Sequence, residues 1–161
     1  MRELIVEPLT KEAFAPFGDV LETDNSDFFY INNRSGQRFH GLGAIDVSDE
    51  SSPLISIVRA AGFENGISFD LLEKHPKGSQ AFFPLKGERF IVIVAKGDEN
   101  IDESTLRAFV TNGNQGINYH RNVWHYLLFA KNQETDFLTI DRAGEDNCIV
   151  KHLSTNYTIS F

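Results

Sequence analysis

Short stretches rich in β-branched and aromatic residues recur along the chain, and turn-forming Gly, Asn, Asp or Pro separates nearly all of them. Such residues favour strands, and many short strands at roughly even spacing are typical of antiparallel barrels and two-sheet sandwiches. The expected strands lie at 4–6, 19–22, 28–31, 43–47, 54–60, 67–73, 80–83, 89–95, 106–110, 123–130, 136–140 and 148–153. Residues 10–14 are predicted to form a brief helix, because Thr10 can cap its first turn and Pro16 follows it.

This pattern predicts an all-β fold, either an antiparallel β-barrel or a two-sheet, jelly-roll-like sandwich, with one or two short helices. The chain has 161 residues, which is the size of one domain, so we expect residues 1–161 to form a single unit. The acidic, turn-rich segment 96–104 is too short to link two domains and is predicted to be a solvated loop.

Charge and cysteine content limit the classes of partner. The net charge of −8 argues against a nucleic-acid surface, which needs clustered Lys and Arg, although one local Arg can still bind a small anion. The first eight residues contain acids and a Pro, so we expect no signal peptide, and no apolar run is long enough for a membrane span. Cys148 is the only cysteine, which favours a cytoplasmic location.

Polar residues continue the apolar faces of two predicted strands. Arg59 lies two residues after Ile57, and Glu73 and His75 lie two and four residues after Leu71. Because residues two apart share a face of a strand, we expect these side chains to point inward and to line a ligand pocket. The alternatives are that Arg59 pairs with Glu73 in a packed core, or that the strands end earlier and these groups face water.

The window 115–125 holds two His, an Arg and the only Trp, and it is predicted to be a loop that leads into a strand. Asn118 and His120 share a face there, as Gln80 and Phe82 do in an earlier strand. Inward polar groups from three strands indicate a binding site, whereas a single His is more often a turn residue with local hydrogen bonds.

Two segments resemble the cupin motifs. Residues 73–87 are similar to a degenerate first motif, with Glu73 at the first His, His75 at the second His and Gln80 at the usual Glu. Residues 113–120 resemble the second motif, with His120 as its last ligand. An amide is a weaker ligand than a carboxylate, which disfavours a redox-active iron oxygenase and leaves nickel, manganese, zinc or no metal as alternatives.

Longer blocks resemble the ureidoglycolate lyase family over nearly the whole chain. They are DFF and INN within 27–33, EKHP and QAF within 73–82, TLRAF at 105–109, TNG at 111–113, NYHRNVWH at 118–125 and DFLTIDR at 136–142. The resemblance implies a cupin-like β-barrel, a homodimer and cleavage of (S)-ureidoglycolate to glyoxylate and urea in allantoin degradation. It also implies nickel as a candidate cofactor.

That reaction suggests roles for the polar residues. His120 or Glu73 is expected to act as the base, with His75 orienting it or binding metal, because groups that titrate near neutrality suit proton transfer. The candidate metal ligands are His75, His120, Gln80 and Glu73.

Substrate binding is assigned to a second set of residues. Arg59 is the first candidate for the carboxylate, in competition with Arg107, Arg121 and Arg142, since guanidinium binds carboxylate through two hydrogen bonds. Amide and phenol groups match the ureido group, and those expected to bind it are Gln80, Asn118 and Tyr119. Structural roles are expected for Trp124 and His125, and a solvent-facing position for His152.

Two other classes of function compete with the lyase. One is a non-catalytic cupin-like module that binds a small carboxylate, which needs the Arg and amides but no acid–base pair. The other is a metal-dependent isomerase or oxygenase on the same barrel, which needs a tightly bound metal ion.

Overall fold

The computed structural model describes residues 1–48, 50–145 and 147–161, and these are almost entirely β structure. The larger, nine-stranded sheet contains, in spatial order, β1 (Arg2–Glu3), β16 (Ile149–Ile159), β8 (Ile67–Lys74), β13 (Trp124–His125), β10 (Phe90–Lys96), β11 (Asp102–Val110) and β2 (Val6–Pro8). Two further strands join it beside β10, namely β14 (Phe129–Lys131) and β7 (Gly62–Phe63). The second sheet has five strands in the order β3 (Gly18–Leu21), β12 (Gly116–Tyr119), β9 (Gln80–Pro84), β15 (Thr135–Arg142) and β6 (Pro53–Ala60).

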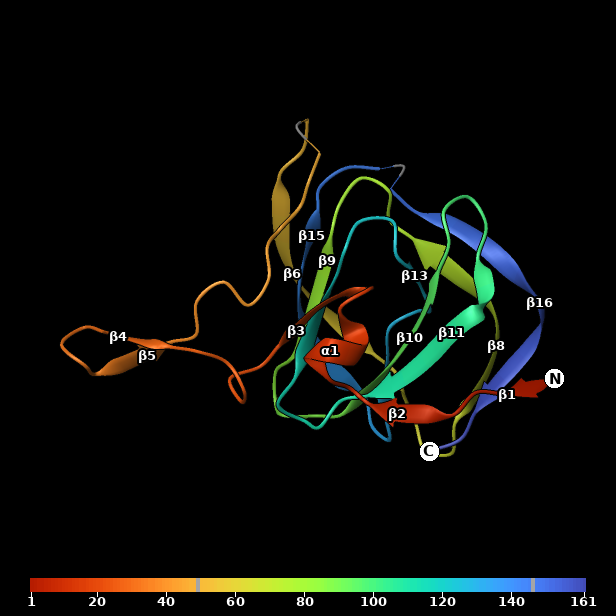
Figure 1. The fold of residues 1–161 in the computed structure, drawn as a ribbon, viewed down its shortest axis with the longest axis horizontal. Coiled ribbons are helices and arrows are strands. Elements are labelled where there is room, and N and C mark those ends of the chain that lie inside the picture. Colours follow the sequence, from red (N-terminus) through yellow and green to blue (C-terminus); the bar gives the residue numbers. More distant parts are fainter. Residues whose placement is uncertain (49, 146) are drawn as a thin grey trace.

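The two sheets curl around a shared interior, as Figure 1 shows, and the predicted all-β, cupin-like class is confirmed. Most neighbouring strands are antiparallel, while β1 with β16, β2 with β11 and β7 with β14 pair in parallel. The helix α1 (Lys11–Phe14) begins where expected, because the Thr10 hydroxyl accepts a hydrogen bond of 3.1 Å from the Ala13 amide.

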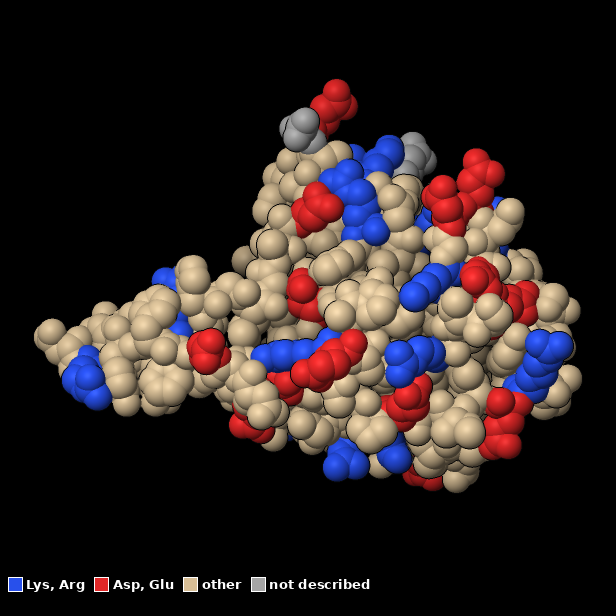
Figure 2. Space-filling model, viewed as in Figure 1, with Lys and Arg blue, Asp and Glu red and all other residues tan. Residues whose placement is uncertain are grey.

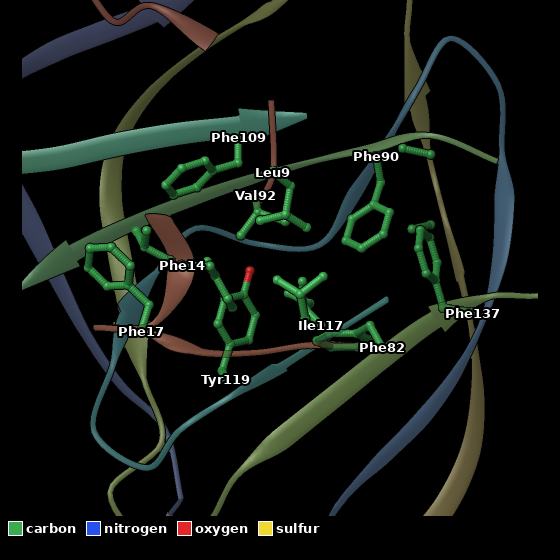
Figure 3. Close-up of a cluster of buried hydrophobic side chains, with 14 residues drawn as sticks. Leu9, Phe14, Phe17, Phe82, Phe90, Val92, Phe109, Ile117, Tyr119 and Phe137 are labelled. Carbon is green, nitrogen blue, oxygen red and sulfur yellow. The ribbon is translucent and has the colours of Figure 1, made fainter. Parts of the chain in front are cut away.

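Strand β10 is buried along nearly its whole length, so it lies at the centre of the protein rather than at an interface. One face packs into an aromatic cluster between the sheets, which includes Phe14, Phe109, Tyr119 and Phe137, and Figure 3 shows these side chains turned toward one another. The other face packs into a second cluster, which the larger sheet encloses by curling.

One close backbone approach joins α1 to the smaller sheet. A Cβ atom on Gly18 would lie 2.0 Å from the carbonyl oxygen of Asn118, so only glycine lets β3 lie this close to β12. The approach brings the loop after β12 onto the end of α1, where the His120 amide donates to the Phe17 carbonyl.

Several strand expectations were wrong in detail. The expected strand 4–6 is split, because the chain leaves β1 at Glu3 and joins β11 only at Val6. The expected strand 123–130 is interrupted between β13 and β14, where the chain moves from pairing with β8 to pairing with β7. Residues 43–47 form only an isolated bridge between Val47 and Gly78, and the window expected as a loop contains β12. The segment expected as a loop at 96–104 enters β11 at Asp102.

The strands β4 (Phe29–Ile31) and β5 (Gly36–Arg38) form a hairpin that projects from the body of the molecule, and we call residues 28–40 the arm (Figure 1). Its turn contains three consecutive left-handed residues, Asn32, Asn33 and Arg34. Acidic and basic side chains are interspersed over the face in Figure 2. Among the described residues, no helix is long and apolar enough to cross a membrane.

Candidate active site

Glu73, His75 and His125 form a polar cluster at the edge of the aromatic core. Glu73 lies near the end of β8, His75 follows that strand, and His125 on β13 pairs directly with Glu73 across the sheet. The Glu73 Oε1 atom lies 3.7 Å from His75 Nε2 and 4.0 Å from His125 Nδ1. One ligand atom from each of the three residues lies within 4.8 Å of the others, which is a spacing that one metal ion can bridge.

Both imidazole rings are oriented by backbone carbonyls. His75 Nδ1 lies 2.6 Å from the Asn147 carbonyl oxygen, and His125 Nδ1 lies 3.0 Å from that of Tyr126. A carbonyl can only accept, so each Nδ1 carries the hydrogen and each Nε2 of the neutral ring keeps its lone pair. Both Nε2 atoms are buried and have no hydrogen-bond partner among the described residues. This is the tautomer and orientation of histidine that binds a metal ion.

Tyr119 fixes the plane of one imidazole. Its ring stacks on His125 with centroids 4.1 Å apart and an angle of 8° between the planes. Burial, together with the nearby Glu73 charge, raises the pKa of the Tyr119 phenol far above its usual value. The phenol therefore stays protonated and packs as a neutral aromatic ring.

The protonation states in the cluster follow from burial and from mutual charge. Burial opposes ionisation of Glu73, but its interaction with His75 and the charge of His125 outweigh this and lower the pKa of the carboxyl. Burial likewise opposes the His75 cation, yet Glu73 and the Asn147 carbonyl raise the pKa of that ring. For His125 the Tyr126 carbonyl and the Glu73 charge also favour the cation, but burial and the His75 charge outweigh them and lower its pKa to about 4.

A cavity of about 300 Å³ lies beside the cluster. Its lining comes from the ends of β9 and β15 and from the loops that follow β8 and β15, and it consists of His75, Ser79, Gln80, Asp141, Arg142, Gly144, Asn147 and Cys148. The thiol of Cys148, which lines the cavity, donates to Glu73 Oε2 at 3.4 Å, while Glu73 Oε1 is the oxygen that approaches the two imidazoles. Burial and the Glu73 charge raise the pKa of the thiol to about 11, so it remains a donor.

Of the predicted site residues, the structure brings Glu73, His75 and Gln80 together and stacks Tyr119 against the cluster. Gln80 Nε2 donates to Asp141 Oδ2 at 3.3 Å inside the cavity. The amide of Gln80 is thus engaged with a carboxylate, in a position suited to contacting a ligand.

His120 and Asn118 share a face, as expected, but it is the outer face of the smaller sheet. Both contact Asp19, with His120 Nε2 3.2 Å from one carboxylate oxygen and Asn118 Nδ2 3.0 Å from the other. Their neighbour Tyr119 takes the inward position, since side chains alternate along β12. His120 is 51% exposed in a separate surface pocket and does not join Glu73 and His75.

Arg59 and Arg107 form their ion pairs with residues outside the cluster. Arg59 was expected to point inward, and that expectation is wrong, because β6 is the outermost strand of its sheet and the Arg59 side chain is 67% exposed. It makes two hydrogen bonds to Asp136. Arg107 pairs with Glu7 of β2. His152 is exposed, as expected, beside Asp70.

The residue that sequence reasoning missed is His125, which was expected to be structural. Trp124 and His125 are adjacent on one strand, so burial of the Trp in the second core cluster turns the His toward Glu73. The sequence alone indicates that Trp124 and His125 point to opposite faces of a strand, but it does not show that β13 pairs with β8. Asp141, Asn147 and Cys148 at the cavity were likewise not assigned roles.

Comparison with known proteins gives one consistent result. A family model described as ureidoglycolate lyase matches residues 1–160. Proteins called ureidoglycolate lyase from Escherichia coli (strain K12 / DH10B) and from Shigella boydii serotype 18 are each 54% identical to the chain over 151 residues. The matched region covers 94% of this chain and 94% of each relative.

The buried His125 is expected to make the metal-free protein sensitive to acid. Its ring has a pKa of about 4 in the folded protein, against an ordinary value of 6.5 in the unfolded chain, so between pH 6.5 and pH 4 the unfolded chain binds a proton that the folded chain does not. The free energy of unfolding should therefore fall by about 3 kcal/mol between pH 6.5 and pH 4 from this group. Denaturant unfolding in EDTA across this range measures the loss, and His125→Gln should remove this part of it. The matched variant of an exposed residue, His152→Gln, should keep the full slope, and equal slopes in all three proteins contradict the assignment.

Proposed function

Since the chain belongs to the ureidoglycolate lyase family, we propose that it cleaves (S)-ureidoglycolate to glyoxylate and urea in allantoin degradation. The structural observation that supports this best is the cluster of Glu73, His75 and His125 beside a small polar cavity. A cavity of about 300 Å³ is at the small end of ligand pockets, which suits a substrate of this size.

The reaction needs little more than the movement of one proton. The substrate carries a hydroxyl group and the ureido nitrogen on the same carbon. When the hydroxyl loses its proton, its electrons form the aldehyde of glyoxylate, and the carbon–nitrogen bond breaks with its electron pair left on nitrogen. That nitrogen takes a proton and urea is released. No water is consumed, so the site must bind, orient and shuttle a proton.

We assign the proton transfer to Glu73. Its lowered pKa keeps the carboxylate ionised at neutral pH, and its Oε2 atom contacts the thiol of Cys148, which lines the cavity. The carboxylate can accept the hydroxyl proton and then return it to the departing nitrogen, and such transfers accelerate reactions by roughly 10²–10⁴-fold. His75 Nε2 lies 3.7 Å from the other oxygen, and when no metal ion is bound the charge of the protonated ring holds Glu73 in position.

The same cluster can hold a divalent metal ion, and we propose nickel or a similar ion as its cofactor. The residues fit, because the buried Nε2 atoms of His75 and His125 have no hydrogen-bond partner in the part of the chain that the structure describes, and Glu73 supplies an anionic oxygen. When bound, such an ion polarises the substrate hydroxyl and lowers its pKa. The proposed set differs from the sequence-based one, since His125 takes the place of His120 and the Gln80 amide is bound to Asp141.

We infer a homodimer from two exposed apolar surfaces that neither sheet covers. On the arm, Phe29 is 49% exposed, and an isolated two-stranded hairpin is at best marginally stable in water. On β6, an edge strand, Ile55 and Ile57 are 77% and 63% exposed. A long, apolar edge strand tends to pair with another chain. In the dimer that we propose, the arm of each copy packs against β6 of the other copy. This exchange of arms buries both exposed apolar surfaces.

We further propose that residues 1–161 act as a single domain in the cytoplasm. The family model spans residues 1–160 as one unit. Cys148 is the only cysteine, so the chain cannot form an intrachain disulfide and gains no stability of that kind from an oxidising compartment.

The reaction is tested by product analysis on (S)-ureidoglycolate, with glyoxylate, urea and ammonia measured together. We expect equal glyoxylate and urea without ammonia. Glu73→Gln should lower kcat by roughly 10²–10⁴-fold, since an amide cannot accept the proton. Glu64→Gln, which makes the same change at an exposed position, should leave kcat unchanged. Release of ammonia indicates an amidohydrolase instead, and an absence of any product indicates a binding module.

The metal site is tested by binding rather than by turnover. After treatment with EDTA and dialysis against Ni²⁺, we expect about one ion per chain by elemental analysis. His75→Gln and His125→Gln should each abolish binding, because each removes an imidazole Nε2 that has no other partner. His120→Gln should bind as the unaltered protein does. Loss of the ion in His120→Gln but not in His125→Gln restores the sequence-based ligand set and contradicts ours.

The dimer is tested by analytical ultracentrifugation. The unaltered protein should sediment as a dimer, and Phe29→Asp combined with Ile31→Asp should give monomers, because a charge on the arm is costly to bury. Ile5→Asp, at a position that is exposed outside the arm and β6, should remain dimeric. A monomeric unaltered protein, or a dimer that survives the arm substitutions, contradicts the arm exchange.

A further inference from the structure

Arg142 is the arginine that lines the cavity. It is the last residue of β15, and it lies across from Pro53 at the start of β6. Its guanidinium is held by two hydrogen bonds, since Nε donates to the Ser48 hydroxyl at 3.0 Å and Nη1 donates to the Glu145 carbonyl at 3.4 Å. Both partners are neutral, so they orient the group without neutralising its charge.

Two glycines leave room for this side chain. A Cβ atom on Gly78 would lie 3.1 Å from Arg142 Cβ, and one on Gly144 would lie 3.2 Å from Arg142 Nη1. Gly144 also has a φ of +100°, a conformation that other residues rarely adopt. The loops before and after Arg142 therefore make space for the guanidinium at the cavity wall.

The other candidate arginines already have carboxylate partners. Arg59 pairs with Asp136, Arg107 with Glu7, and Arg121 with Asp46. Arg142 has no ion pair with a carboxylate among the described residues, although Asp141 lines the same cavity. The Asp141 carboxylate instead accepts the amide hydrogen of Gln80 at 3.3 Å. Within the described residues, the charge of Arg142 is therefore oriented but not neutralised, and such a charge in a cavity beside a proposed catalytic base is suited to an anionic ligand.

We propose that Arg142 binds the carboxylate of the substrate, and that the Gln80 and Asp141 pair binds the N–H groups of its ureido end. This assignment rests on the proposed function and extends it to specificity. The substrate has an acceptor-only carboxylate at one end and N–H donors at the other, and the cavity offers a donor-only guanidinium and an acceptor carboxylate. With both ends held, the carbon that carries the hydroxyl lies between them, in the cavity that His75 also lines.

The test compares two substrates in three proteins. For (S)-ureidoglycolate, Arg142→Gln should lower kcat/KM by roughly 10- to 100-fold, mainly through KM, because a charged hydrogen-bonded contact is lost. For N-(hydroxymethyl)urea, which is the same carbinolamide without the carboxylate, Arg142→Gln and the unaltered protein should have equal rates. Arg59→Gln removes an arginine already paired with Asp136 and should behave as the unaltered protein with both substrates.

A binding measurement separates this proposal from the proposed reaction. Titration with oxamate, which carries a carboxylate and an amide, should show binding to the unaltered protein and to Arg59→Gln, and at least tenfold weaker binding to Arg142→Gln. Thermal unfolding of each variant, together with Arg142→Lys, shows whether the fold is kept. If ureidoglycolate is not cleaved but oxamate binding depends on Arg142, the reaction is wrong and the subsite stands. If Arg142→Gln slows both substrates equally, or binds oxamate normally, the subsite is wrong while the reaction stands.

Discussion

The pairing of the two-residue strand β13 with β8 on one side and β10 on the other holds the candidate site together. Trp124 anchors this strand, since its ring is fully buried and its Nε1 donates to the Asp98 carbonyl at 3.2 Å. Lys74 donates to the same carbonyl and lies over the Trp124 ring, so β8 and β13 are tied together on that face. His125 then has no freedom to turn away, and it meets Glu73 on the opposite face. The geometry of the cluster is thus set by packing on the far side of the sheet.

The cluster is costly to the fold, which is evidence that it has a use. Leaving a buried polar atom without a partner costs about 1–3 kcal/mol, and two imidazole nitrogens of the cluster have no hydrogen-bond partner within residues 1–48, 50–145 and 147–161. The surrounding aromatic core, with Phe14, Phe109 and Tyr119 in contact, offsets this cost by burying large apolar surfaces. Buried polar groups that weaken an otherwise well-packed fold are expected at functional sites, where function rather than stability determines the residue.

The positions of the strands along the chain were predicted from the sequence more accurately than the way in which the strands pair. Alternation correctly placed Glu73 and His75 on one face of β8, although this is the face opposite to the buried Leu72 and Lys74. The same rule failed for Arg59, because β6 is an edge strand and is exposed along nearly its whole length. It failed for His120 in a different way, since Asn118 and His120 do share a face but Tyr119 has the inward one. The face of a strand that points into the protein depends on its pairing with strands that are distant in the sequence. His125 could therefore be assigned to the site only after the structure had shown that β13 pairs with β8.

An acidic protein can still select an anionic substrate because the selection is local. Charges on the surface are screened beyond about 8 Å at physiological ionic strength, whereas groups within a cavity act at contact distance. The cavity is lined by a guanidinium and a carboxylate on adjacent residues, Arg142 and Asp141, so it contains both a positive and a negative charge. A ligand with an anionic end and a donor end matches that arrangement in only one orientation. In the proposed mode of binding, that orientation holds the reacting carbon in the cavity that His75 lines, and binding energy from the two ends contributes to the alignment that proton transfer requires.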